Sequence, residues 1–300
     1  MTASQAPASI PALTGSGLLF MAQAAFWFAV MSLLVKLAGA TMPTMQIVFG
    51  RGCVTLLLSA LLLWRARISP FRSRPHLLLL RGLFGSTALI CFYAAVVHLP
   101  LAEATVIQQT SPLYTALLAA WLLRERLEPR VLVSIAICFA GVLAIARPES
   151  LFGAGVAPDF PWQFAFVAVL GAALSSLAYV TVRRLGQRHP PLLVVFFFPV
   201  VTVPLSAPFA LTAWVAPGAV GWLLLAAIGV VTQFGQIALT KGLAREPAGR
   251  ATTVGYLQIA FATLFGAVVF DALPDAASWL GMALILGGLL FGVRPSRRTG

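Results

Sequence analysis

The stretch Leu123-Arg-Glu-Arg-Leu127 has a counterpart 146 residues later in Val269-Phe-Asp-Ala-Leu273. In the same way, Pro100-Leu-Ala-Glu-Ala-Thr105 is matched 147 residues later by Pro247-Ala-Gly-Arg-Ala-Thr252. A nearly uniform offset of 146 or 147 residues in a chain of 300 predicts two copies of one structural unit. The first member of the 123–127 pair is basic and its counterpart is acidic, which bears on how the two units are oriented.

The composition excludes an ordinary soluble domain. Apolar residues make up 60% of the chain and charged residues only 9%, whereas about a quarter of the residues in soluble proteins are charged. The net charge of +12 would suggest nucleic-acid binding in a soluble protein. Here the basic residues lie between long apolar runs, so we expect them to face the anionic leaflet of a lipid bilayer. No nucleic-acid partner is expected.

Ten apolar stretches are each long enough to cross a bilayer as a helix, which takes about 20 residues. They run without the alternation of a membrane β-barrel, so the sequence predicts an all-α polytopic membrane protein with ten transmembrane helices. Six tryptophans lie near their ends, as in an interfacial belt: Trp64, Trp121, Trp162, Trp214, Trp222 and Trp279. The expected spans are 15–38, 43–64, 77–98, 101–122, 129–147, 161–182, 191–213, 219–241, 249–270 and 276–293.

The positions of the basic residues predict the orientation of these spans. Sixteen of the twenty Lys and Arg residues fall in alternate gaps, and cytoplasmic loops carry such an excess. Both tails, residues 1–14 and 294–300, are then expected to be cytoplasmic. Five spans in each half (15–148 and 161–293, joined by the linker 149–160) is an odd number, so the second half must insert upside down. Two inverted five-helix repeats around a central cavity are the architecture of many secondary transporters.

Several motifs resemble those of the drug/metabolite transporter superfamily, specifically its ten-helix EamA-type members. The resemblance covers essentially the whole chain. The residues that carry it are Lys36, Arg51, Leu80-Arg81-Gly82-Leu83, Leu99-Pro-Leu-Ala-Glu-Ala-Thr105, Pro112, Leu123-Arg-Glu125, Gly141 and Ala146-Arg-Pro148.

The resemblance implies a basket of two five-helix halves in a bacterial inner membrane. Members of the family move amino acids, nucleotide-like metabolites, riboflavin-type vitamins or organic anions. Related four-helix multidrug transporters use a Glu in the first span for proton-coupled export. Residues 15–38 contain no acidic residue, so we do not expect that mechanism here.

Charged side chains inside a bilayer are costly and therefore mark functional sites. Arg51 lies well inside the second predicted span, and Lys36 and Glu103 lie near the same outer face. We expect Arg51 and Lys36 to face the cavity and attract a substrate carboxylate or phosphate, with Glu103 as a coupling or gate residue. The alternative is a buried ion pair or an outer-gate latch with a structural role only.

Uncharged polar residues recur at helical spacing, which places each set on one face of its helix. Thr105, Gln108, Pro112 and Thr115 form such a face in the fourth span. These side chains either line the cavity or hydrogen-bond neighbouring helices. Pro112 and Pro204 are the candidate hinges. The further candidates for the substrate cavity are Trp27, Tyr93, Gln108, Gln109, Ser175, Tyr179, Gln233, Gln236, Tyr256 and Gln258.

The function expected from this pattern is a secondary transporter that moves a small molecule by alternating access, with export of an amino acid or related metabolite preferred. Uptake of a vitamin, nucleotide-like metabolite or organic anion is the alternative, and a membrane-embedded enzyme a distant one. No cofactor or metal is expected, because the three cysteines lie in apolar runs without ligand spacing. Gly288 and Gly292 form a GxxxG motif that permits dimerisation, but a monomer is preferred.

Overall fold

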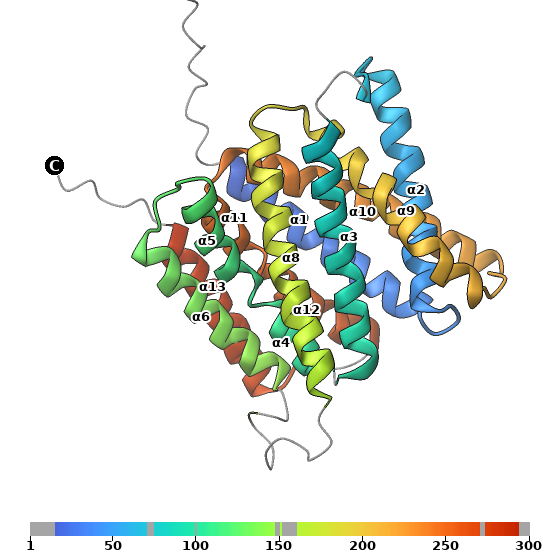
Figure 1. The fold of residues 1–300 in the computed structure, drawn as a ribbon. Helices are drawn as coiled ribbons and strands as arrows, with labels where there is room; N and C mark the ends of the chain where they lie inside the picture. Colours follow the sequence, from blue (N-terminus) through green and yellow to red (C-terminus); the bar gives the residue numbers. More distant parts are fainter. Residues whose placement is uncertain are drawn as a thin grey trace, which may run out of the picture.

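The computed structural model describes residues 16–70, 75–99, 101–147, 151, 161–270 and 274–293. Eight helical stretches in these ranges are long and apolar enough to cross a membrane. The chain is therefore an all-helical polytopic membrane protein (Figure 1). Its helices are α1 (Ser16–Ala38), α2 (Thr44–Arg65), α3 (Pro75–His98), α4 (Leu101–Gln108), α5 (Ser111–Leu122), α6 (Pro129–Ala146), α8 (Trp162–Gly186), α9 (Pro191–Thr212), α10 (Ala219–Arg245), α11 (Ala248–Val254), α12 (Leu257–Phe270) and α13 (Ala276–Val293).

The fourth and ninth predicted spans are each divided into two helices. In the fourth span the break follows α4 at Gln108, and Pro112 lies in the first turn of α5. Proline has no backbone N–H, so it cannot continue the hydrogen bonds of a preceding helix but fits the first turn of a new one. The polar face predicted from Thr105 to Thr115 assumed one continuous helix and is interrupted here. In the ninth span the break falls at Gly255 and Tyr256, 146 residues later.

The main contacts between the two halves are repeated symmetrically. The closest partner of α1 is α10, and the closest partner of α3 is α8. In the repeat, α8 is the counterpart of α1, and α10 is the counterpart of α3. The α1–α10 and α3–α8 contacts are therefore equivalent in the two halves. Gly82 of α3 lies against α9, where an added Cβ would meet the Phe197 carbonyl oxygen at 2.6 Å. Gly229, its counterpart in α10, lies against Val54 of α2 at 2.4 Å.

Helices α6 and α13, the last of each half, form an antiparallel pair that is tightly packed. An added Cβ on Gly141 would lie 2.6 Å from the Gly281 carbonyl oxygen. The Ser134 hydroxyl donates a hydrogen bond of 2.6 Å to the Gly288 carbonyl oxygen. Gly292 also faces Ser134. The GxxxG motif of Gly288 and Gly292 is thus used for packing within this chain.

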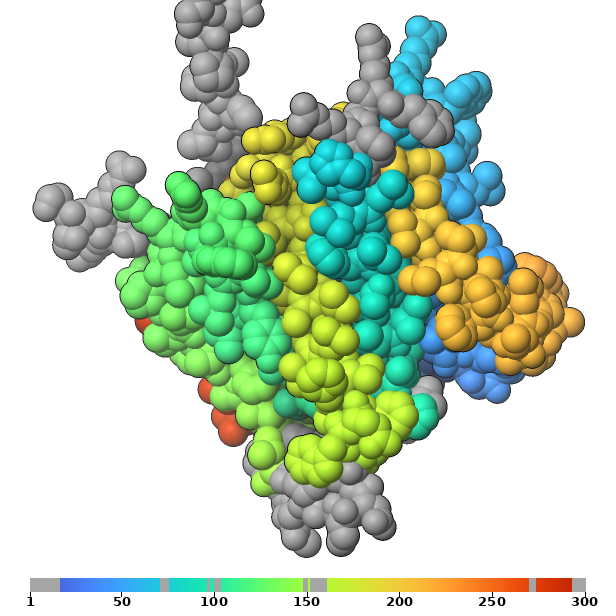
Figure 2. Space-filling model, viewed as in Figure 1, coloured from blue at the N-terminus to red at the C-terminus, as the bar shows by residue number. Residues whose placement is uncertain are grey.

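The exterior is apolar along the helices, as a lipid-facing surface requires. All six tryptophans predicted at span ends are exposed, and Trp64 and Trp121 both expose 75% of their surface. On the face shown in Figure 2, α8 and α3 lie side by side. The turns at 66–70 and 187–190, which belong to basic gaps, lie at the upper end in Figure 1. The turn at 39–43 and the starts of α8 and α13 lie at the opposite, lower end.

Candidate functional site

A cavity lies between the two halves, at the level where α4/α5 and α11/α12 are broken. Its wall combines α1 with the two breaks, α8 and α10. Polar groups from both breaks face an otherwise apolar wall, which is the usual composition of a small-molecule site. The residues lining it are Met21, Ala24, Ala25, Phe28, Gln109, Ser111, Pro112, Tyr179, Leu239, Thr252, Gly255, Tyr256 and Gln258.

The two breaks are joined by a hydrogen bond across the halves. In a continuous helix the Leu113 N–H would donate to the Gln109 carbonyl, but here it donates to Thr110 at 3.0 Å. The Gln109 carbonyl oxygen accepts instead from the Tyr256 hydroxyl at 2.9 Å. Tyr256 is 1% exposed, and an unpaired carbonyl in this interior would be costly. The break in one half is therefore stabilised by a side chain from the break in the other.

Four residues predicted to line the cavity do so: Gln109, Tyr179, Tyr256 and Gln258. The predicted hinge residue Pro112 lines it as well. Next to these, Gln108 donates from Nε2 to the Ser175 hydroxyl at 3.1 Å, so these two predicted residues also lie together. This bond connects α4 to α8, which belong to different halves.

The remaining candidates lie apart from the cavity lining. Arg51 is buried on α2, where its Nη1 lies 3.3 Å from the Met31 sulfur. Gln233 accepts from the Ser59 hydroxyl at 3.0 Å, an α10–α2 contact. Half-buried Trp27 stacks on Phe234, half-buried Tyr93 lies against Phe92, and Lys36 and Pro204 are exposed. Glu103 belongs to α4, and its side chain lies outside the described part of the structure.

Arg81 was missed as a site residue, because it is only the fifth residue of the predicted span 77–98 and reads there as an interfacial charge. In the structure its side chain is 3% exposed. Its Nη2 donates to Gln236 Oε1 at 2.8 Å, and its guanidinium lies 4.6 Å from the centre of the Phe198 ring. Among the described residues, Arg81 Nε and Nη1 have no hydrogen-bond partner. The only sequence signal for it was its place in Leu80-Arg81-Gly82-Leu83.

An ion pair joins the halves at the end of the molecule where the basic turns gather. Arg183 Nε of α8 lies 2.7 Å from Glu125 Oε1 in the α5–α6 turn. Arg183 Nη1 also donates to the Leu243 and Ala244 carbonyl oxygens at 3.1 and 2.8 Å, at the end of α10. The second Glu125 oxygen accepts from the Ala248 N–H at 2.8 Å. We call this group the Glu125–Arg183 latch.

A second acidic residue lies beside the latch. Glu246 follows the end of α10 and is 1% exposed. Burial raises the pKa of its carboxyl, although Arg250 and then Arg183 oppose this by their charge. Arg250 lies 3.7 Å from one Glu246 oxygen, while the other oxygen has no hydrogen-bond partner among the described residues.

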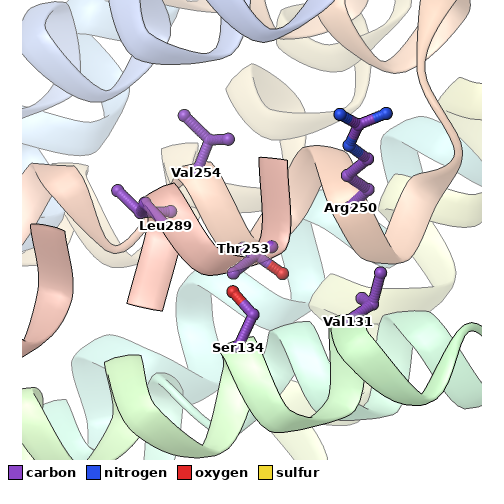
Figure 3. Close-up of a pocket in the computed structure, with 7 residues that line it drawn as sticks. Val131, Ser134, Arg250, Thr253, Val254 and Leu289 are labelled. Atoms are coloured by element: carbon purple, nitrogen blue, oxygen red, sulfur yellow. The ribbon is translucent and has the colours of Figure 1, made fainter. Parts of the chain in front are cut away.

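A smaller pocket lies between α6, α11 and α13 (Figure 3). Ser134 and Thr253 face each other across it, and Arg250 points away from this pair. Both hydroxyls already donate to backbone carbonyls, Ser134 to Gly288 at 2.6 Å and Thr253 to Gly249 at 2.8 Å. The pocket is therefore a packing gap rather than a second binding site.

At the opposite end, Arg147 pairs with Asp275 between the end of α6 and the start of α13. Hydrogen bonds from the Ser278 backbone and side chain lower the pKa of Asp275, and Arg147 adds to this. Both side chains are about half exposed, so solvent screens the pair and its contribution to stability is small.

Comparison with known proteins identifies the kind of protein that this architecture belongs to. The EamA-like transporter family matches residues 15–147 and again 162–294. The pseudopaline exporter CntI of Pseudomonas aeruginosa is 34% identical over 275 residues, which cover 91% of this chain and 94% of that protein. An uncharacterized transporter of Helicobacter pylori is 31% identical and covers 88% of this chain and 90% of its own length. One solved crystal structure superposes with a TM-score of 0.81 at 24% identity, covering 92% of this chain and 96% of that one.

Proposed function

This chain belongs to the EamA-like transporter family, and we propose that it exports a small amino-acid-type metabolite across the inner membrane of a bacterium. The observation that carries the proposal is the cavity between two halves that are broken at equivalent positions. Broken helices expose backbone polar groups only where a cavity or the protein interior can satisfy them. The name of the 34%-identical Pseudomonas relative, an exporter, supports the outward direction.

The chemistry of the cavity supports a small, partly apolar and hydrogen-bonding cargo. Gln109 and Gln258 offer amide groups, and Tyr179 and Tyr256 offer aromatic faces. An amino-acid-type molecule presents complementary groups, namely donors and acceptors at one end and an apolar body at the other.

The Glu125–Arg183 latch is the proposed gate on the cytoplasmic side. The alternate basic gaps support this placement, because the latch lies among the basic turns. Glu125 belongs to the first half, whereas Arg183 and Ala248 belong to the second. Rocking of one half against the other toward an inward-open state must break these bonds. The bond between Tyr256 and Gln109 lies at the pivot of the same movement.

Export is tested by filling the cavity. Ala25 lines it and is 2% exposed, whereas Leu19 of the same helix is 61% exposed toward the lipid. Ala25→Trp should block transport, and Leu19→Trp, of equal bulk, should not. Bacterial cells expressing the native chain, either variant or an empty vector are compared by mass spectrometry of the medium and of cell extracts.

The expected result is at least one amino-acid-type metabolite enriched in the medium of cells with the native chain or Leu19→Trp. Cells with Ala25→Trp at the same membrane abundance should resemble the vector control. Depletion of a metabolite from the medium by the native chain would contradict export and favour uptake. An Ala25→Trp variant with native transport would show that the cavity is not the site.

A further inference from the structure

We propose that Arg81 binds the carboxylate of the transported metabolite, so that the substrate class is a carboxylate-bearing molecule. This inference rests on the proposed transport function and gives the cargo a defined charge. Its starting point is the burial of Arg81, which is 3% exposed within a membrane-spanning helix. A cation in such a place is costly unless an anion or several acceptors compensate its charge.

The described surroundings of Arg81 compensate its charge only in part. One hydrogen bond goes to a neutral amide, Gln236 Oε1, and the guanidinium faces the ring of Phe198. None of the ion pairs found among the described residues includes Arg81. Two of its three guanidinium nitrogens, Nε and Nη1, are buried without an acceptor in that part of the chain. A carboxylate supplies both the missing charge and the missing acceptors.

The position of Arg81 connects it to the cavity. Arg81 lies on α3, which packs along α8, the helix that carries the cavity residue Tyr179. Gln236, which accepts from Arg81, lies one helical turn before the cavity residue Leu239 on α10. The guanidinium therefore lies outside the lining residues, on the side of the cavity that α8 and α10 form. We infer that the substrate carboxylate approaches it from the cavity past Tyr179.

The fold itself does not require an arginine at this position. With the repeat offset of 147, Arg81 corresponds to Ile228, which is fully buried in an apolar cluster with Met42, Ile47 and Leu225. The following glycines, Gly82 and Gly229, make the same close helix contact in both halves. The packing is thus repeated, whereas the arginine at this position is present in α3 and is replaced by isoleucine in α10.

Arg51 provides a matched control. It is a second buried arginine, 5% exposed, and by the same offset it corresponds to Phe198, the residue against which Arg81 lies. Both arginines therefore occupy equivalent helix contacts in the two halves. No guanidinium nitrogen of Arg51 is among the buried atoms that lack a partner in the described structure.

The test measures whether purified protein prefers a carboxylate over its neutral isostere. Benzoate and benzamide form one pair of probes, and L-phenylalanine and L-phenylalaninamide form another. A ligand of the folded state raises the apparent melting temperature with its concentration. The native chain should be shifted more by at least one acid than by its amide. Arg81→Gln should lose this preference, with about a tenfold or greater loss of affinity for the acid, while Arg51→Gln keeps it.

Arg81→Lys keeps the positive charge without the planar fork of donors, so it should retain the preference at a higher probe concentration. This variant decides the matter if Arg81→Gln does not purify as a monodisperse protein, because equal shifts by acid and amide in Arg81→Lys would overturn the assignment. Equal shifts in the native chain, or a preference lost in Arg51→Gln and kept in Arg81→Gln, would overturn it too.

Metabolite export without any carboxylate preference would refute only this inference. A preference lost in Arg81→Gln without any export would refute only the transport proposal.

Discussion

Glu125→Gln removes the carboxylate that connects the two halves at the proposed cytoplasmic gate, with almost no change in side-chain volume. The variant leaves Arg183 with its two bonds to the Leu243 and Ala244 carbonyls. The Ala248 N–H loses a charged acceptor, although the glutamine oxygen can still accept from it. The variant therefore weakens the latch selectively and leaves the packing in place.

The size of the effect follows from the burial of the pair. Removing one partner of a fully buried ion pair costs about 3–5 kcal/mol. The side chains of Arg183 and Glu125 retain 12% and 17% exposure, so water screens part of the interaction. A hydrogen bond to a charged group contributes about 1.5–3 kcal/mol, and we take about 2 kcal/mol for this pair. If these bonds exist only while the cytoplasmic side is closed, the ratio of open to closed protein rises about 30-fold.

The assay measures how fast the cavity is reached from the cytoplasmic side. Cys53, Cys91 and Cys138 are free thiols and are first replaced by alanine. A single cysteine is then placed at Leu239, which lines the cavity. Labelling of inside-out membrane vesicles with a membrane-impermeant maleimide should be up to about 30-fold faster in Glu125→Gln than in the parent chain.

Glu128→Gln is the matched control, because Glu128 lies in the same turn and is exposed. It removes the same charge without touching the latch, so its labelling rate should equal that of the parent. Equal rates for Glu125→Gln and Glu128→Gln would refute the gate. Faster labelling of Glu125→Gln in right-side-out vesicles, with no change in inside-out ones, would show that the latch closes the other side.

Three further predictions concern stability, measured as the thermal unfolding of purified protein. Burial raises the pKa of Glu246, so its ionised form destabilises the folded chain, and Glu246→Gln should melt higher than the native chain near neutral pH. This gain should disappear as the pH falls below 4.5, the ordinary pKa of the carboxyl, because the native side chain is then neutral as well. A gain in melting temperature that does not depend on pH would contradict this reasoning. Gly141→Val brings a Cβ to 2.6 Å from a backbone oxygen of α13 and should lower the stability by about 1–3 kcal/mol. The Cβ of Gly287→Ala meets nothing within 4 Å, so this control should not be destabilised. Similar melting temperatures for both variants would refute the close packing of α6 against α13. Tyr256→Phe deletes the bond to the Gln109 carbonyl and should cost about 1 kcal/mol, and an unchanged melting temperature would show that the two breaks are held by packing alone.

An all-helical membrane protein built from two repeats could be predicted from the sequence, and so could the bounds of several spans to within a few residues. Apolar runs of about 20 residues can satisfy their backbone in lipid only as helices. The offset of 146 or 147 residues identified the repeat that the family match to residues 15–147 and 162–294 confirms. The predicted span 276–293 coincides with α13, and 43–64 differs from α2 by one residue at each end. These features are local or periodic, so they can be read along the chain.

The site was only partly predictable, because its contacts depend on helices that are far apart in the sequence. Gln109 and Tyr256 were identified as polar residues in apolar spans, yet the bond between them crosses 147 residues. Arg81 and Arg183 looked like interfacial charges because they lie near span ends. Only the packing of α3 against α8 and α9, together with the bond to Gln236 of α10, encloses Arg81. Only the approach of α8 to the α5–α6 turn pairs Arg183 with Glu125. Periodicity fixes which face of a helix a residue occupies, but the neighbour that this face meets is decided by tertiary packing.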